Sequence, residues 1–196
     1  MTAALTAKGL ATRGRIVDGA VEVVRMRGAA NTGLDDIRAA TGASGSQLGH
    51  YFPEGKHQLL MAVAAREAEL ILEEQRPWLD NLKSWESWNR WSGDLLDTYE
   101  RQGPNCGLSA LMSQIDPSDP ALMALVAGMF EEWEKALARG VRALQDVDPE
   151  AYRVDPETAA VAILASIQGG MLMMVATGSA RHLRTALESA LASLHP

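Results

Sequence analysis

The chain has 196 residues and a net charge of −7, with 47% hydrophobic and 22% charged residues, as in ordinary globular proteins. No uninterrupted apolar run approaches the ~18–20 residues that span a bilayer, and the N-terminus lacks a secretory h-region, which argues against a membrane or exported protein. The single cysteine, Cys106, excludes an intrachain disulfide and a cysteine-only metal cluster, and a reducing cytoplasm fits this composition best.

The charge is unevenly distributed along the chain. Residues 1–57 contain seven Lys and Arg against five Asp and Glu, so this segment is +2 and residues 58–196 carry −9. A basic N-terminal segment on an acidic body can bind a polyanion such as DNA. Chance asymmetry explains the same numbers equally well.

Helix-favouring residues dominate the chain and strand signals are almost absent. We therefore predict an all-α fold of about nine helices. Their expected ranges are 11–27, 33–41, 44–52, 56–76, a helix through 85–99 that ends by 103, 106–114, 120–145, 156–177 and 180–194.

Local signals mark the second and third of these helices. Thr32 with Asp35 and Ser44 with Gln47 both have the spacing of a capping box, in which side chains satisfy the first N–H groups of a helix. Gly42 can adopt the positive φ that a tight turn requires.

Two short helices joined by such a turn, with a third helix packed across them, form a helix-turn-helix. Small residues at Ala39, Ala40 and Ala43 suit a close helix crossing. Of the second helix, we expect Leu34, Ile37 and either Ala40 or Thr41 to face inward. The helix that starts at Ser44 is then the one expected to enter a DNA major groove with its N-terminal end leading.

Residues 11–60 resemble the DNA-binding domain of the TetR family of transcriptional regulators. The matching residues occur in the family's order: Ile16, Ala20, Gly28, Thr32, Leu34, Ile37, Ala40, Gly42, Ala43, Ser44, Leu48, Tyr51, Phe52, Lys56 and Leu59. The form Phe-Pro-x-Gly-Lys-x-Gln-Leu at residues 52–59 resembles the LmrA/YxaF-like subgroup. The resemblance implies a helix-turn-helix DNA-binding domain at residues 1–57 and a helical ligand-binding and dimerisation domain at residues 58–196.

The chain departs from the family pattern at two positions. The family usually has Gly where Ser46 stands and Tyr where Gly49 stands, and that Tyr commonly touches phosphate or base. Gly49 also lowers the local helix propensity by ~1 kcal/mol relative to Ala. DNA binding would then depend more on His50 and Tyr51.

Seven residues are the candidate DNA contacts: Thr32, Ser44, Ser46, Gln47, His50, Tyr51 and Lys56. Short polar side chains at a helix N-terminus let backbone N–H groups approach phosphates, and lysine pairs with them directly. The alternatives are that Ser44 and Gln47 only cap a helix, that Tyr51 packs into the core and that Lys56 is an ordinary surface lysine.

Methionine and tryptophan are abundant in the remainder of the chain, and such side chains line adaptable apolar pockets. The candidate effector contacts are Trp85, Trp88, Met112, Met129, Trp133, Gln168 and Met171. Plain core packing is the alternative for each of them.

The last two predicted helices carry many small residues together with a leucine stripe that begins at Leu183. Small residues allow close helix approach, and in the TetR family two such helices from each subunit form the dimer interface. The chain is expected to form a homodimer in this way, unless the same faces only pack within one subunit.

No sequence motif indicates catalysis, a cofactor or a metal site, although Cys106 with one of the histidines could be imagined as a nucleophile pair. We therefore expect a non-enzymatic, cytoplasmic regulator without a cofactor. It would be a repressor that binds a palindromic double-stranded DNA operator and is released by a small apolar effector. A helical protein that sequesters small molecules, with a weakened DNA-binding segment, is the alternative that Gly49 favours.

Overall fold

The computed structural model describes residues 5–103, 106–114 and 116–194, and within these ranges it contains nine α-helices and no strand. The all-α prediction is confirmed. The helices are α1 (Ala7–Arg27), α2 (Leu34–Thr41), α3 (Gly45–Tyr51), α4 (Lys56–Leu79), α5 (Trp85–Gln102), α6 (Gly107–Met112), α7 (Pro120–Val147), α8 (Pro156–Thr177) and α9 (Arg181–Ala192).

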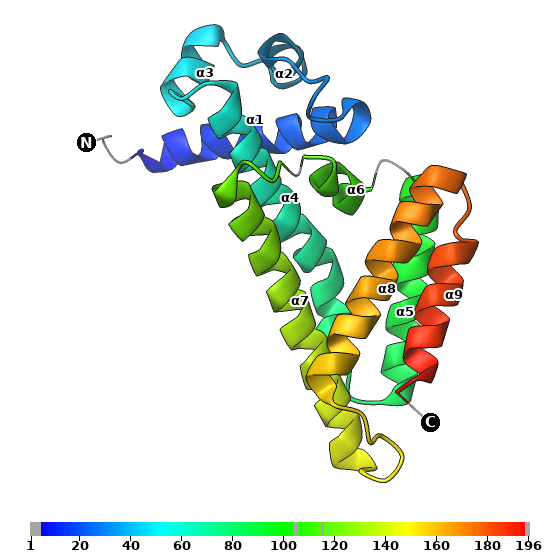
Figure 1. Cartoon of the computed structure of the whole chain (residues 1–196). Helices are drawn as coiled ribbons and strands as arrows, with labels where there is room; N and C mark the ends of the chain where they lie inside the picture. The colour runs from blue at the N-terminus through cyan, green and yellow to red at the C-terminus, as the bar shows by residue number, and fades with distance from the viewer. Residues whose placement is uncertain (1–4, 104–105, 115, 195–196) are drawn as a thin grey trace.

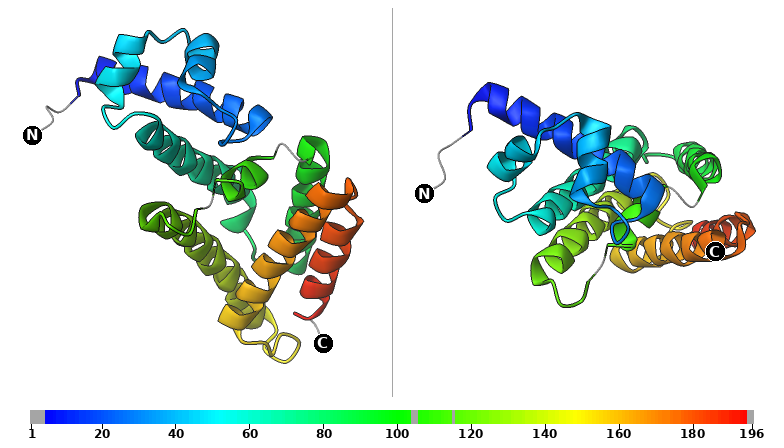
Figure 2. Two further views of the ribbon diagram at one scale, coloured as in Figure 1. Left: turned by 45° about the horizontal axis from the view of Figure 1, so that its top comes forward. Right: turned by 90° about the horizontal axis from the view of Figure 1, so that it is seen from above.

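The helices form a small head and a larger body (Figure 1). The head consists of α1, α2 and α3, and the body of α5 to α9, while α4 runs from one into the other. In the body, α4 and α7 make one arm and α5, α8 and α9 make the other. The arms meet at the end far from the head, and α6 lies between them beneath α1, as the two further views also show (Figure 2).

Each part has its own hydrophobic core. The head core joins α1, α2 and α3 and includes Leu59 and Val63 from the start of α4. The body core begins at Ala64, one residue further along α4. Because α4 contributes to both cores, the two parts share one continuous helix.

Most helix limits follow the local signals, and the differences have local causes. α1 begins at Ala7, four residues earlier than expected, because the Thr6 hydroxyl accepts the N–H of Gly9 and caps the helix. α4 continues through Pro77 to Leu79. Since Pro77 lies in the last turn, its missing N–H costs this helix only one hydrogen bond.

Three expectations about the head are wrong. Ala39 and Ala40 are exposed, and of the three alanines assigned to the helix crossing only Ala43 is buried. Leu34 is exposed as well. Of Ala40 and Thr41, either of which was expected to face inward, Thr41 is the one that is buried. The close approach of α1 and α2 instead depends on Gly19, where an added Cβ would lie 2.6 Å from Cγ2 of Thr41.

Three tryptophans occupy the centre of the body. Trp88, Trp91 and Trp133 are fully buried, and the rings of Trp88 and Trp91 meet edge to face with centroids 5.5 Å apart. Trp91 also donates its indole N–H to Oε1 of Gln75, at 2.9 Å. The apolar face of α5 is therefore built on Trp88 and Trp91, whereas Trp85 at the start of the helix is only half-buried.

α8 is the exception to the expectation about apolar runs. By length and composition alone it could cross a membrane, although 44% of its most apolar window is buried inside the protein. Such a helix is weak evidence for a membrane span, because core helices have the same composition. Here α8 packs between α7 and α9.

Gly170 allows α8 and α9 to pack at close range, and its replacement tests this contact. An added Cβ would lie 2.5 Å from the Leu183 Cα, which is backbone and cannot rotate away. We expect Gly170→Ala to lower the free energy of unfolding by ~1–3 kcal/mol, less the gain in helix propensity. Thermal unfolding followed by circular dichroism would measure this change.

Gly128→Ala on α7 is the matched control, because nothing lies within 4 Å of its added Cβ. It should leave the melting temperature unchanged or raise it. If both variants shifted the melting temperature equally, the α8–α9 contact would not be the cause.

Candidate nucleic-acid interface and ligand cavity

The start of α3 has the predicted capping box. The Ser44 hydroxyl accepts the N–H of Gln47 at 3.1 Å, and Oε1 of Gln47 accepts the N–H of Ser44 at 2.9 Å. Gly42 precedes this cap in the left-handed conformation, with φ of 66°. The turn and cap together fix the direction in which the N-terminus of α3 points.

The exposed side of α3 carries polar side chains. Ser44, Ser46 and His50 are exposed and Gln47 is half-buried. The hydroxyls of Ser44 and Ser46 lie 2.9 Å apart and share a hydrogen bond. The Oε1 atom of Gln47 accepts the N–H of Ser44 in the cap, and its amide NH₂ carries two further hydrogen-bond donors.

Two further candidate DNA contacts, Tyr51 and Lys56, lie at the C-terminal end of α3 and at the start of α4. Lys56 is the first residue of α4 and is half-buried. Tyr51 packs partly against the head core and meets the ring of His50 edge to face, at 4.9 Å between centroids. The structure thus brings Ser44, Ser46, Gln47, His50, Tyr51 and Lys56 to α3 and the adjoining start of α4.

The capping role predicted for Thr32 is wrong. Its side chain is 1% exposed and donates its hydroxyl to the carbonyl of Gly28 at 2.8 Å, so it ties α1 to the loop before α2. α2 is instead capped at Gly33, whose N–H donates to Oδ2 of Asp36 at 2.8 Å. This hydrogen bond, helped by Arg27, lowers the pKa of Asp36.

Two arginines of α1 contact the other helices of the head. Arg15 donates to the carbonyl of Thr41 at 2.7 Å, at the C-terminal end of α2 where the helix dipole favours a cation. The guanidinium of Arg13 lies 5.1 Å from the centroid of the Phe52 ring, a cation–π contact. Both side chains thus hold α1 against α2 and α3.

Two glycines leave one side of α3 bare. Gly45 and Gly49 are one helical turn apart, and a Cβ added at either would meet nothing within 4 Å. Together with Leu34, Arg38 and Gly55 they border a hollow of about 260 Å³ between α2, α3 and the start of α4. The surface beside α3 is therefore concave at Gly45 and Gly49.

A buried ion pair joins the head to the body. Nε of Arg25 on α1 donates to both carboxylate oxygens of Glu67 on α4, at 2.9 and 3.2 Å. The Glu67 side chain is 2% exposed, and burial raises its pKa although Arg25 acts in the opposite direction. Gly107 of α6 closes over the pair, since a Cβ there would lie 2.1 Å from Oε1 of Glu67.

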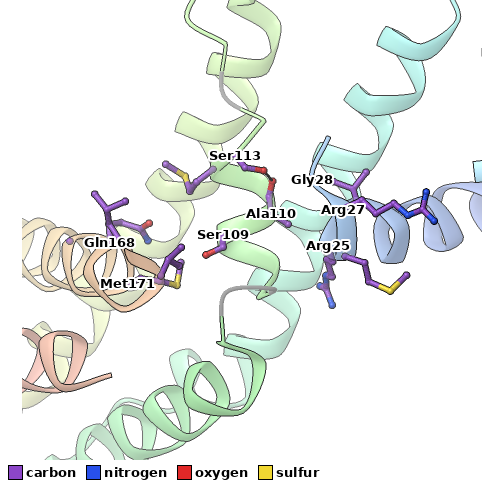
Figure 3. A pocket seen from close by; sticks show the side chains of 14 residues that line it. Arg25, Arg27, Gly28, Ser109, Ala110, Ser113, Gln168 and Met171 are labelled. Carbon is purple, nitrogen blue, oxygen red and sulfur yellow. Dashed lines mark hydrogen bonds between the residues drawn. The ribbon is translucent and has the colours of Figure 1, made fainter. Parts of the chain in front are cut away.

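Next to this ion pair lies a cavity of about 690 Å³ between α1, α6 and α8. Figure 3 shows Arg25 and Gly28 on the α1 side, Ser109 and Ala110 on α6, and Gln168 and Met171 on α8. Arg27 also borders the cavity, but its side chain points away from the other labelled residues. A molecule in this cavity would contact head and body together.

The cavity unites three of the seven predicted effector contacts, Met112, Gln168 and Met171. The other four do not line it. Met129, Trp88 and Trp133 are buried in the body core, and half-buried Trp85 packs against that core with its ring 6.4 Å from that of Tyr152. For these four residues the alternative of core packing describes what the structure shows.

Arg25, Ser109 and Leu172 could not be selected as cavity residues from the sequence, because each comes from a different helix. A weaker signal was present at Arg25 and Glu67. Arg25 follows Val21 by four residues, and Glu67 follows Val63 and Ala64 by four and three, so both are charged residues at the spacing of an apolar stripe. Two such residues of opposite sign can pair across a helix interface.

Cys106 caps α6 and packs against Met171. Its thiol is buried and caps α6 by accepting the N–H of Ser109 at 3.4 Å, while it lies 3.4 Å from the sulfur of Met171. Within residues 5–103, 106–114 and 116–194, no group of three or more His, Cys, Asp or Glu side chains could hold a metal ion.

Comparison with known proteins adds to this geometry. A family model for the C-terminal domain of LmrA/YxaF-like transcriptional regulators matches residues 86–189, which include most of α5 and all of α6 to α8. No curated protein matches the chain.

Solved structures share the fold over nearly the whole chain. A TetR transcriptional regulator from Chloroflexus aurantiacus J-10-FL is 25% identical with a TM-score of 0.77, covering 95% of this chain and 96% of its own. Reduced E. coli NemR is 15% identical, with a TM-score of 0.80 and coverages of 95% and 98%. A putative transcriptional regulator from Saccharomonospora viridis in complex with choline is 20% identical, with a TM-score of 0.75 and coverages of 93% and 96%.

Proposed function

Because the chain belongs to the TetR family of transcriptional regulators, we propose that it is a repressor that binds a palindromic operator as a homodimer and is released by a small, largely apolar ligand. The observation that carries this proposal is the capped helix α3, whose exposed N-terminal side presents Ser44, Ser46 and the amide of Gln47. Each subunit would place α3 in a major groove, with the two grooves ~34–36 Å apart or a multiple of that. The protein would act in the cytoplasm and catalyse no reaction.

Contacts to DNA divide into two kinds. Gln47 and Ser46 are proposed to read base edges, while Lys56, Tyr51, His50 and the α3 N-terminus hold the phosphate backbone. Thr32 is buried, so any contribution from it would come through its bond to Gly28 rather than by touching DNA.

The proposed dimer interface is the exposed face of α8 together with α9. Leu172 of α8 is 70% exposed, and Val161, Met173 and Val175 are exposed as well, which is unusual for large apolar side chains on one helix. Ala165 and Gly169 lie between them and are also exposed, so a second helix could approach closely.

A second candidate is a protein that sequesters a small molecule and binds DNA weakly. The bare side of α3 at Gly45 and Gly49 favours it, because two positions next to the groove-facing residues offer no side chain to DNA. The two candidates differ in whether the protein binds one DNA sequence saturably, which gel-shift assays with DNA flanking its own gene would measure.

The base-reading role of Gln47 can be tested by Gln47→Ala. We expect specific binding to weaken by ~1–3 kcal/mol, because a base-edge contact is lost, while binding to unrelated DNA stays the same. Fluorescence anisotropy with operator and with scrambled duplex would measure both. Gln58→Ala on α4 is the control, since it removes a glutamine that also accepts a backbone N–H, that of Glu54, but lies outside α3. An equal loss on both DNAs would rule out base reading by Gln47.

The phosphate contact of Lys56 can be tested by Lys56→Ala. We expect weaker binding to every sequence and a plot of log K against log salt that is shallower by about one unit, because one fewer counterion is released. Lys83→Ala, in the exposed loop before α5, is the control and should not change the slope. A slope for Lys56→Ala equal to that of the unmodified protein would contradict the contact.

The dimer interface can be tested by Ala165→Glu, which places a charge in the middle of the exposed α8 face. We expect sedimentation velocity to show a monomer where the unmodified protein is a dimer, because an unpaired charge would be buried in the interface. Ala127→Glu on the exposed side of α7 is the matched control and should remain dimeric. A dimer that persists in Ala165→Glu would place the interface elsewhere.

A further inference from the structure

The side chains that line the cavity between α1, α6 and α8 include basic and amide groups but no acidic group, and this restricts the ligands that can bind there. None of its fourteen lining residues is Asp or Glu, although the chain has 25 acidic residues against 18 basic ones. Two arginines and one glutamine line it, and most other members of the set are apolar. A ligand that fits must therefore bring hydrogen-bond acceptors of its own.

Arg25 is the first donor. Of its five N–H bonds, only the one on Nε makes a hydrogen bond to a described residue, to Glu67. Its Nη1 atom lies 3.9 Å from Oε1 of Glu22, beyond hydrogen-bond distance, and the Arg25 side chain as a whole is 19% exposed. The guanidinium can therefore receive a second anion without first losing its partner.

Gln168 is the second donor, from the opposite helix. Its Nε2 atom is buried and has no hydrogen-bond partner among the described residues. An unpaired buried amide costs ~1–3 kcal/mol, which a ligand oxygen would recover. In Figure 3 Gln168 lies on α8 across α6 from Arg25.

Apolar side chains form the rest of the cavity surface. Met112 and Met171 contribute flexible thioethers, and Leu172 and Val175 contribute aliphatic surface. Leu172 and Val175 also belong to the α8 face proposed for dimerisation, so a partner subunit would lie beside the same opening.

We propose that this cavity binds a small apolar carboxylic acid, with Arg25 and Gln168 as the hydrogen-bond donors available to its oxygens and the hydrocarbon part against Met112, Met171 and Leu172. The acid's role as the effector rests on the proposed function, whereas its binding does not. A carboxylate on the remaining N–H groups of Arg25 shares the guanidinium with Glu67 and weakens the contact that joins α1 to α4. Occupancy therefore favours arrangements in which the head is displaced, and the shift is limited by the acid's differential affinity for the two states.

The binding test uses isothermal titration calorimetry on the full chain without DNA. The probes are decanoate and 2-naphthoate, their uncharged counterparts 1-decanol and 2-naphthol, and the cation decyltrimethylammonium, all below micelle-forming concentrations. We expect each acid to bind at least about tenfold more tightly than its alcohol, since hydrogen bonds to a charged group are the stronger ones. Alcohols that bind as tightly as the acids, a tighter cation, or no binding of either acid would overturn the proposal.

Two variants locate the carboxylate. Gln168→Leu should weaken decanoate by about tenfold and 1-decanol less, while Gln102→Leu on α5, outside the cavity, should change neither. Arg25→Met combined with Glu67→Met removes both charges and leaves none buried alone, which keeps the fold intact where a single replacement could fail. This double variant should bind acid and alcohol equally well. Acid preference that survives both changes would overturn the proposed site.

A second measurement separates this inference from the proposed function. Decanoate is titrated into the complex of the protein with a selected DNA duplex, and release is followed by anisotropy. Specific DNA binding without acid binding would overturn the ligand class and leave the regulator in place. Acid binding by a protein that has no specific DNA complex would support the site and overturn the repressor.

Discussion

The buried ion pair between Arg25 and Glu67 is the contact on which the arrangement of head and body depends. The head and body have separate hydrophobic cores that meet along α4. Arg25 ties the end of α1 to the side of this helix, and Gly107 lets α6 close over both charges. Losing one partner of such a pair costs ~3–5 kcal/mol, because the other charge stays buried. The orientation of α1, and with it that of α3, therefore depends on a contact with α4 that is covered by α6 of the body.

The same pair is suited to rearrangement because its two charges are unequally satisfied. Burial raises the pKa of Glu67 even beside an arginine, so desolvation of this carboxylate is not fully compensated. Arg25 uses one N–H on Glu67 and is also one of the residues that line the cavity. An anion that enters the cavity could therefore be stabilised by Arg25 while the apolar cores of head and body stay buried. The hydrogen bond from Arg15 to Thr41 within the head does not involve a residue that lines the cavity, and it holds α1 to α2 so that the two can move together.

Local patterns predicted the elements of this protein, and tertiary contacts decided the rest. Helix periodicity, Gly42 and the Ser44–Gln47 box are properties of neighbouring residues, and the structure has all of them. Thr32 was assigned to a cap by spacing alone, but Gly28 competes for its hydroxyl from the preceding helix end. The tryptophans suggested a pocket by composition, whereas Trp88, Trp91 and Trp133 fill the body core. Arg25 and Gln168 became visible as a pair only once α1 and α8 were placed on opposite sides of α6.

α8 connects the proposed ligand cavity with the proposed dimer interface, because its different sides face different neighbours. Its inner side packs on α7 and α9, with Gly170 against Leu183. Gln168 and Met171 turn toward α6 and the cavity, and Ala165, Gly169 and Leu172 are open to a second copy. A helix held by a partner subunit cannot retreat when a ligand enters beside it, so the displacement must fall on α6 and α1. In a dimer built on α8, the two heads are the parts left free to move, and their separation is what a two-groove operator measures.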